Sequence, residues 1–399
     1  MKPIQSASDL AVNGAPPAFA HPLHVGRPNL GSYEKFAQYA KDIFSRNWLT
    51  NNGPLVQELE KRIESYLNVN HCIAMCSGTV ALEIAIRALQ LEGEVILPSF
   101  TFIATAHALS WQAITPVFAD IDPITHNLDP VSVRSMITPR TSGIIGVHLW
   151  GRPAPIDELQ RIADDHNLQL LFDAAHAFGC SHNKTMIGNF GQCEVFSFHA
   201  TKFFNTFEGG AIVTNDDSLA DAVRLMRNFG FEGEDNVIHP GTNGKMMEVA
   251  AAMGLVNLDS INSVIEHNQL NYQTYKKELA NLPNLNVLTY NPPEQHNYQY
   301  IVIEVSDNSP VDRNQLVKIL HTENIKARKY FWPGCHKMKP YREYYPHAGV
   351  LLPITETVAE KVLLLPTGLE MNRGMVQTVC SIIKTILNNC EKKPHTKTL

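Results

Sequence analysis

The sequence predicts an α/β protein with a large domain built on a mostly parallel seven-stranded sheet and a smaller C-terminal α+β domain. Three observations support this prediction. The chain has 399 residues, which suggests about two domains. Between about residues 71 and 216, short apolar runs alternate with helix-like segments, as in a parallel sheet with crossover helices. After about residue 285 the alternation gives way to a mixture of strands and helices.

The large domain is expected to begin with two helices, at residues 33–47 and 54–66. Pro54 suits the first turn of the second helix, where its missing N–H costs little. The apolar runs that follow are short and continuous, which is typical of strands buried on both faces. The expected strands are residues 71–76, 94–99, 115–121, 142–150, 168–175, 193–200 and 209–216. The expected helices between and after them are residues 80–89, 101–112, 156–167, 217–230 and 246–285.

The smaller domain is expected to contain strands at residues 297–306 and 324–331 and helices at residues 310–323, 355–363 and 370–390. We therefore divide the chain into four parts. These are an extended N-terminal segment rich in Pro, Gly and Ala (residues 1–30), the large domain (31–270), the small domain (271–390) and a basic, polar, disordered tail (391–399).

The composition narrows the class of function. The formal net charge of −6 does not favour binding to nucleic acid. The sequence shows neither a signal peptide nor an apolar run of the roughly 20 residues that a membrane helix needs. The 7 cysteines never form a CxxC pair, and reduced thiols are the simple interpretation. The sequence therefore predicts a cytoplasmic protein that binds neither nucleic acid nor membranes.

Two polar residues follow apolar runs and are candidates for catalysis. Asp173 ends one expected strand, and Lys202 follows another before a turn that contains Gly209 and Gly210. Ligands of open α/β sheets bind at the carboxyl ends of the strands, so both side chains are expected at a site. A sheltered lysine can have a lowered pKa and act as an amine nucleophile. Taken separately, Asp173 could be a helix cap and Lys202 a solvated side chain.

The pair becomes more specific together with Ser77, Gly78 and Thr79, which lie where a strand leads into a helix. A pyridoxal phosphate enzyme needs a Schiff-base lysine, a carboxylate opposite the ring nitrogen and a phosphate cradle at a helix N-terminus. The small Gly78, the Thr79 hydroxyl and the helix dipole suit such a cradle, although the same residues could form a simple N-cap.

The residues around these positions resemble the DegT/StrS-type sugar-nucleotide aminotransferases, a family of pyridoxal phosphate fold type I. The segment Phe196–Gly210 resembles the Schiff-base segment of that family, and Phe172–Gly179 resembles its aspartate segment. Further motifs follow the family's order at residues 46–60, 97–109, 116–122, 241–255, 328–338 and 363–367. The resemblance covers roughly residues 25–390, and several motifs in register are far more specific than any one of them.

The resemblance implies a role for each matching residue. Lys202 forms the Schiff base with pyridoxal phosphate and moves the substrate proton, Asp173 pairs with the ring nitrogen, and His176 lies next to the phenolic oxygen, where many relatives have Gln. Phe102 covers the ring. Asn243 reaches the phosphate of the neighbouring subunit, which implies a homodimer with shared sites. The residues expected to contact the cofactor phosphate are Ser77, Gly78, Thr79 and Ser197.

The resemblance also implies the substrates. L-glutamate donates the amino group, pyridoxamine phosphate carries it, and a nucleotide-linked keto sugar accepts it. The best match is to members that aminate dTDP-4-keto-6-deoxy-D-glucose to dTDP-4-amino-4,6-dideoxy-D-glucose, a precursor of polysaccharides such as O-antigen. Another UDP-, GDP- or dTDP-linked keto sugar, aminated at C3 or C4, is the alternative. The residues expected to contact the substrate are Trp48, Thr50, Tyr330, Phe331 and His336.

Other classes of protein remain alternatives from the sequence. A metal-dependent hydrolase could use His148, Asp173, His176 and His199, but their spacing has no HExxH signature, so no metal is expected. A non-catalytic regulator with the same fold is disfavoured because both Lys202 and Asp173 are present. An ordinary amino-acid transaminase would use a small-domain arginine to bind the α-carboxylate, and neither Arg328 nor Arg342 lies in such a motif.

Overall fold

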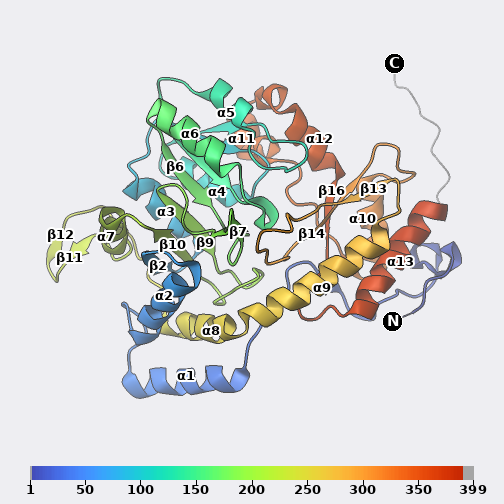
Figure 1. Ribbon diagram of the computed structural model, residues 1–399, viewed down its shortest axis with the longest axis horizontal. Coiled ribbons are helices and arrows are strands. Elements are labelled where there is room, and N and C mark those ends of the chain that lie inside the picture. The colour runs from blue at the N-terminus through green and yellow to red at the C-terminus, as the bar shows by residue number, and fades with distance from the viewer. Residues whose placement is uncertain (1, 390–399) are drawn as a thin grey trace.

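The computed structural model describes residues 2–389 and has a seven-stranded sheet at its centre (Figure 1). The strands lie in the order β2, β10, β9, β6, β5, β3, β4. β10 is antiparallel to both neighbours, and every other pair is parallel. In chain order the strands are β2 (His71–Met75), β3 (Glu94–Pro98), β4 (Thr115–Ala119), β5 (Thr141–Val147), β6 (Gln169–Asp173), β9 (Cys193–Ser197) and β10 (Gly210–Thr214). The predicted fold class is confirmed.

Helices cover both faces of this sheet because successive apolar side chains point to opposite faces. Ile144 and Ile145 on β5 are both fully buried, but they belong to different cores. Ile144 packs in the core formed with α2, α5, α6 and α8, whereas Ile145 packs in the core formed with α3, α4 and α7. These helices are α2 (Pro54–Leu67), α3 (Gly78–Ala88), α4 (Ile103–Ser110), α5 (Pro130–Met136), α6 (Ile156–His166), α7 (Asp217–Met226) and α8 (Glu248–Asp259).

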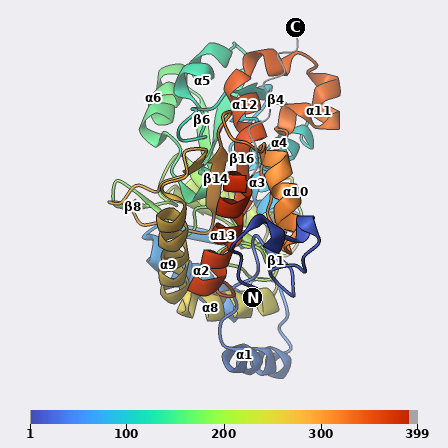
Figure 2. The ribbon, with the colours of Figure 1, turned by 90° about the vertical axis from the view of Figure 1, so that its right-hand side faces the viewer.

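A smaller unit with its own apolar core is joined to the sheet by α9 (Ile261–Leu279) (Figures 1 and 2). Its antiparallel sheet has the order β13, β14, β16, and its core includes side chains of α9, α10 and α13. The elements are β13 (Leu285–Val287), β14 (Ile301–Val305), β16 (Val362–Leu365), α10 (Arg313–Thr322) and α13 (Arg373–Asn389). The proposed domain boundary after residue 270 falls inside α9, which continues from one unit into the other.

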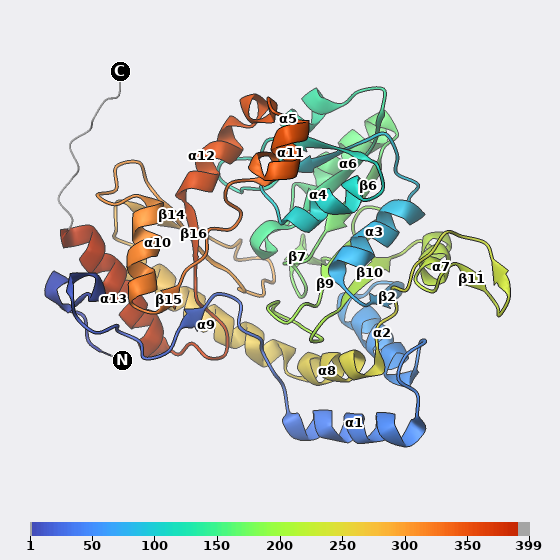
Figure 3. The same cartoon turned by 180° about the vertical axis from the view of Figure 1, so that it is seen from behind.

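The N-terminal segment packs on the smaller unit. Leu10 and Phe19 are buried in its core, and β1 (Leu23–His24) pairs in parallel with β15 (Ile325–Lys326). From β1 the chain crosses towards the larger unit and enters α1 (Tyr33–Arg46), which lies against α8 (Figure 3). The segment therefore connects the two units along a path separate from α9.

Some expectations of local structure were wrong. The expected helix at residues 246–285 is two helices that are interrupted at Ser260. The expected strand at 324–331 has only two strand residues, and the chain then turns so that Tyr330 and Phe331 reach a cavity. The expected tail at 391–399 lies outside the described residues.

The remaining strands and α-helices are β7 (Ser181–His182), β8 (Thr185–Met186), β11 (Phe231–Glu232), β12 (Asn236–Val237), α11 (Lys339–Tyr344) and α12 (Pro353–Lys361).

Candidate active site

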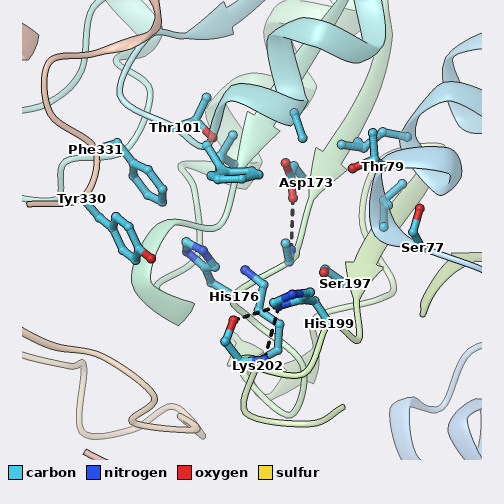
Figure 4. A pocket seen from close by; sticks show the side chains of 18 of the residues that line it. Ser77, Thr79, Thr101, Asp173, His176, Ser197, His199, Lys202, Tyr330 and Phe331 are labelled. Atoms are coloured by element: carbon cyan, nitrogen blue, oxygen red, sulfur yellow. Dashed lines mark hydrogen bonds between the residues drawn. The ribbon is translucent and has the colours of Figure 1, made fainter. Parts of the chain in front are cut away.

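A cavity of roughly 330 Å³ lies at the carboxyl end of the central strands. Val147, Asp173 and Ser197 are the last residues of β5, β6 and β9, and all three line it. The N-terminus of α3 closes one side, and the chain between β15 and α11 contributes Tyr330 and Phe331 on the other (Figure 4). This is where ligands bind in open α/β sheets.

Lys202 lies on a loop between β9 and β10 that is closed at its base by a hydrogen bond from the Thr206 N–H to the Phe198 carbonyl, 2.9 Å. The backbone N–H of Lys202 donates to the His199 carbonyl at 2.8 Å, which closes a tight turn of the chain at Lys202. Burial lowers the pKa of the Lys202 amine to about 8, and the negative charge of Asp173 partly opposes this shift. A substantial fraction of the amine is therefore neutral, and nucleophilic, near neutral pH.

Asp173 lines the same cavity and lies across it from Lys202 (Figure 4), where hydrogen bonds hold its side chain in place. Asp173 is 6% exposed, and its carboxylate accepts a hydrogen bond from the Thr105 hydroxyl at 2.8 Å and another from the Ala175 N–H at 3.1 Å. Thr105 is on α4, so two elements fix this side chain. A buried carboxylate with open space beside it is suited to hold a cationic ring nitrogen.

The N-terminus of α3 provides unpaired backbone donors. The Val80 N–H donates to the Ser77 hydroxyl, and the Ala81 N–H donates to the Ser77 carbonyl. The helix itself offers no acceptor to the N–H groups of Gly78 and Thr79, which precede them. A Cβ on Gly78 would lie 2.8 Å from the Ser197 Cβ, so only glycine lets the helix approach β9 this closely. Together with the Ser197 hydroxyl, these groups are suited to bind an anion.

His176 is buried beside the cavity, in a stack of aromatic rings with Trp150 and Phe331. Its Nδ1 accepts a hydrogen bond from the backbone N–H of Trp150 at 3.3 Å, so the proton of the neutral ring is on Nε2. Burial, and secondarily the charge of Lys202, lowers the pKa of His176 well below its ordinary value. His176 is therefore a neutral hydrogen-bond donor across the physiological pH range.

The cavity also contains residues that were not predicted to contact the cofactor or the substrate, notably Thr101, Tyr300, Thr201, Glu208 and His199, of which His199 was considered only as a metal ligand. His199 accepts hydrogen bonds at Nδ1 from the Thr201 N–H and hydroxyl, and its Nε2 lies 3.4 Å from a Glu208 carboxylate oxygen. His199 and Glu208 could have been selected because they flank Lys202 in its motif. Tyr300 comes from the smaller unit, about 100 positions along the chain, and no local signal indicates it.

Ten of the predicted site residues line the cavity, and four do not. The ten are Ser77, Gly78, Thr79, Phe102, Asp173, His176, Ser197, Lys202, Tyr330 and Phe331. Trp48 and Thr50 lie on an exposed turn, in which the Trp48 indole N–H donates to the Thr50 carbonyl at 2.6 Å. Asn243 is exposed at the edge of the sheet, and His336 is buried between Ser99 and Glu356.

The alternative metal site is not assembled. His148 is fully buried, with its Nε2 3.5 Å from Glu194, and its Nδ1 accepts a hydrogen bond from the Ala154 N–H. It does not line the cavity with Asp173, His176 and His199. Across residues 2–389, no group of three or more His, Cys, Asp or Glu side chains is arranged to hold a metal ion.

The sequence and structure are similar to those of known aminotransferases. A model of the DegT/DnrJ/EryC1/StrS aminotransferase family matches residues 32–384. The dTDP-4-amino-4,6-dideoxy-D-glucose transaminase of Escherichia coli is 36% identical over 90% of this chain and 98% of its own length. GDP-perosamine synthase of Caulobacter vibrioides is 32% identical over 92% of this chain and 98% of its own. The solved structure of DesI in the presence of its TDP-sugar product has a TM-score of 0.92, 45% identity, and coverage of 96% of this chain and 97% of that one.

Proposed function

The chain belongs to the DegT/DnrJ/EryC1/StrS aminotransferase family, and from this we propose that it transfers the amino group of L-glutamate to dTDP-4-keto-6-deoxy-D-glucose. The product would be dTDP-4-amino-4,6-dideoxy-D-glucose, a building block for surface polysaccharide. One observation carries the proposal. An amine of lowered pKa, a buried carboxylate and an anion-binding helix N-terminus face a single cavity.

The residues present fit pyridoxal phosphate, the cofactor of this family. The anion site at the start of α3 would hold its phosphate, Asp173 would hold its ring nitrogen in the protonated form, and Lys202 would bind it covalently. The absence of a side chain at Gly78 fits this arrangement, because a Cβ there would meet Ser197 and close the cradle. When bound, the cofactor supplies an electron-accepting ring that stabilises negative charge on the substrate carbon.

The protein's own groups then perform the proton transfers. With the cofactor bound, the Lys202 amine would take the α proton of glutamate and later return a proton to the sugar carbon, in a ping-pong cycle. Its pKa of about 8 suits both directions, since neither protonation state is strongly favoured near neutral pH. His176 would donate from Nε2 to the phenolic oxygen of the cofactor, and Phe331 and Tyr300 line the same cavity and help to exclude water from it.

The choice of sugar nucleotide rests on the relatives. The transaminase from Escherichia coli and the TDP-sugar complex of DesI support a dTDP-linked sugar, and the greater identity to DesI favours it. GDP-perosamine synthase supports a GDP-linked keto sugar as the second candidate. Our proposed substrate contacts stay Trp48, Thr50, Tyr330, Phe331 and His336. Of these five, Tyr330 and Phe331 line the cavity, and the other three do not.

We also propose a homodimer with shared sites. It would account for the exposed positions of Trp48 and Asn243 and the half-buried position of Thr50, because these residues would then contribute to the cavity of the partner subunit. A cytoplasmic location suits a nucleotide-sugar substrate. Within the part of the chain that the structure describes, no helix has both the length and the apolar character needed to cross a lipid bilayer.

Absorbance spectroscopy and a substrate panel test the function. The protein with pyridoxal phosphate should show a visible band that borohydride removes and that Lys202→Ala lacks. Asp173→Asn should keep its fold but lose most turnover, because the ring nitrogen is no longer held protonated. With glutamate as donor, dTDP-4-keto-6-deoxy-D-glucose should react fastest among dTDP-, UDP- and GDP-linked keto sugars. Faster turnover of the GDP-linked sugar would replace our substrate assignment with the second candidate.

A further inference from the structure

The loop that carries Lys202 is irregular, and its backbone needs partners outside the loop. Thr201 and Phe203, on either side of Lys202, belong to no helix or strand. Their carbonyls do not take part in the hydrogen bonds that close the base of the loop. A carbonyl inside the protein without a partner costs free energy, and Phe203 is buried, so the partners of these two oxygens show what holds the backbone beside Lys202 in place.

Each of these carbonyls accepts a hydrogen bond from a side-chain amide of a distant segment. The Asn29 Nδ2 donates to the Phe203 carbonyl at 3.1 Å, and the Gln299 Nε2 donates to the Thr201 carbonyl, also at 3.1 Å. Asn29 is 8% exposed and lies in the segment between β1 and α1. Gln299 is 6% exposed and lies two residues before β14. The backbone on both sides of Lys202 is thus held by segments that are distant in the sequence.

Further buried amides extend the contact on the Asn29 side. The Asn205 Nδ2 donates to the Asn29 carbonyl at 2.8 Å. Asn257 on α8 donates to the Asn205 carbonyl at 2.8 Å and accepts from the Gly31 N–H at 2.8 Å. The N-terminal segment, the lysine loop and α8 therefore share one network, in which displacement of one member strains the others.

The chemical type of these groups fits a role near a titrating amine. A primary amide satisfies a carbonyl without bringing a formal charge close to Lys202. A lysine or arginine in the same place would lower the pKa of the amine further, and an acid could not donate to the carbonyl. Holding the loop with neutral donors keeps the position of the amine and its pKa independent of each other.

We propose that Asn29 and Gln299 are positioning residues that clamp the backbone on both sides of Lys202. The inference rests on the proposed function in one respect, namely that Lys202 is the reacting amine. A displacement of about 1 Å of a catalytic group can reduce a rate by up to about a hundredfold, so the clamp acts on turnover more than on substrate affinity.

Two substitutions remove one donor each with little change of shape. Gln299→Met keeps the length of the side chain and adds no charge. Asn29→Asp keeps the oxygen that accepts from the Leu369 N–H but adds a negative charge, as the control variant below also does. In the cofactor-free protein, each should accelerate hydrogen–deuterium exchange of the backbone amides at residues 199–206. In the loaded enzyme, each should lower kcat by about tenfold or more and change the KM of the keto sugar by less than about twofold.

Asn189→Asp is the matched control. Its amide donates to the carbonyls of Leu67 and Met186 at 2.9 and 3.1 Å, and it lies before β9, at the opposite end of that strand from Ser197. This variant should lose thermal stability but keep wild-type exchange in the loop and wild-type kcat. If one clamp variant does not fold, the other decides.

Unchanged loop exchange with wild-type kcat in the clamp variants would overturn the proposal, as would an equal loss of kcat in Asn189→Asp at equal stability. The exchange measurement needs neither cofactor nor substrate. It therefore tests the clamp even if the protein proves not to use Lys202 for transamination, which the borohydride test of Lys202→Ala decides separately.

Discussion

At the scale of single residues, the environment of Lys202 makes a measurable prediction about its titration. Burial lowers the pKa of the amine from 10.5 to about 8, and the charge of Asp173 raises it against that shift. Only the neutral amine is nucleophilic. Competitive labelling of the cofactor-free protein with an amine-reactive reagent, followed by mass spectrometry, should therefore give half-maximal reaction of Lys202 near pH 8.

The variant Asp173→Asn tests the direction in which the charge of Asp173 shifts the pKa of Lys202. Removing the carboxylate removes a group that favours the ammonium form, so the labelling curve of Lys202 should move to lower pH. A curve near pH 10 in the parent protein, or a move to higher pH in the variant, would contradict this account.

The tautomer of His176 leads to a second prediction. Because its Nδ1 accepts from the Trp150 N–H and burial lowers its pKa, the ring acts as a neutral donor. His176→Gln keeps a neutral donor and should keep kcat within about tenfold, whereas His176→Leu removes the donor and should lose more. The pH profile of the Gln variant should match that of the parent, since burial lowers the pKa of His176 and keeps its ring neutral. A lost limb of the profile in that variant would show that His176 changes protonation during the reaction.

At the scale of secondary structure, the start of α3 is predicted to serve the cofactor as well as the fold. Ser77→Ala removes the hydroxyl that accepts from the Val80 N–H and should cost about 1 kcal/mol of unfolding free energy. It should also weaken binding of pyridoxal phosphate, because the donors of the first turn become less ordered.

Ser32→Ala is a matched control for that substitution. The Ser32 hydroxyl caps α1 by accepting from the Lys35 N–H at 3.3 Å, far from the cavity. Equilibrium dialysis of the cofactor should show a weaker complex for Ser77→Ala alone. Equal weakening in both variants would assign the effect to general loss of stability.

The same scale shows where sequence reasoning succeeds. Strands such as β5 were found because they are apolar on both faces, and Asp173 and Lys202 were found because polar residues directly follow such strands. The strand expected at residues 324–331 was wrong because its pattern resembles a strand, while continuous pairing is limited to Ile325 and Lys326 with β1, and Arg328 makes only an isolated bridge to Leu364 of β16. Tyr300, Asn29 and Gln299 have no local signal at all, since their roles arise only when distant segments meet.

At the scale of the whole molecule, large apolar side chains remain exposed near the predicted residues that miss the cavity. Trp48 and Leu49 are 45% and 59% exposed, Phe44 on α1 is 78% exposed, and Phe229 and Met247 flank the segment of Asn243. α1 and the β11–β12 hairpin both protrude from the body in Figure 1. A surface of this kind is typical of a subunit interface, which supports the proposed homodimer.

Mixing two inactive variants tests whether the sites are shared. Lys202→Ala removes the amine, and Asn243→Asp would place a carboxylate against the cofactor phosphate, so both homodimers should be nearly inactive. If Asn243 acts on the partner subunit, a hybrid dimer has one site with both defects and one with neither. Random exchange of equal amounts gives half hybrids, so about a quarter of the sites are intact and about a quarter of the parent activity should return.

The same mixture has a different outcome if each subunit builds its own site. Every site in a hybrid then carries one defect, and no activity returns. Sedimentation of the mixture checks that dimers form, and a brief mild-denaturant step followed by dilution allows subunits to exchange. Because neither variant can contribute a functional site by itself, recovered turnover can come only from Asn243 of one chain acting beside Lys202 of the other. If confirmed hybrids recover no activity, Asn243 acts within its own subunit, and the proposal that the two subunits share their sites is wrong.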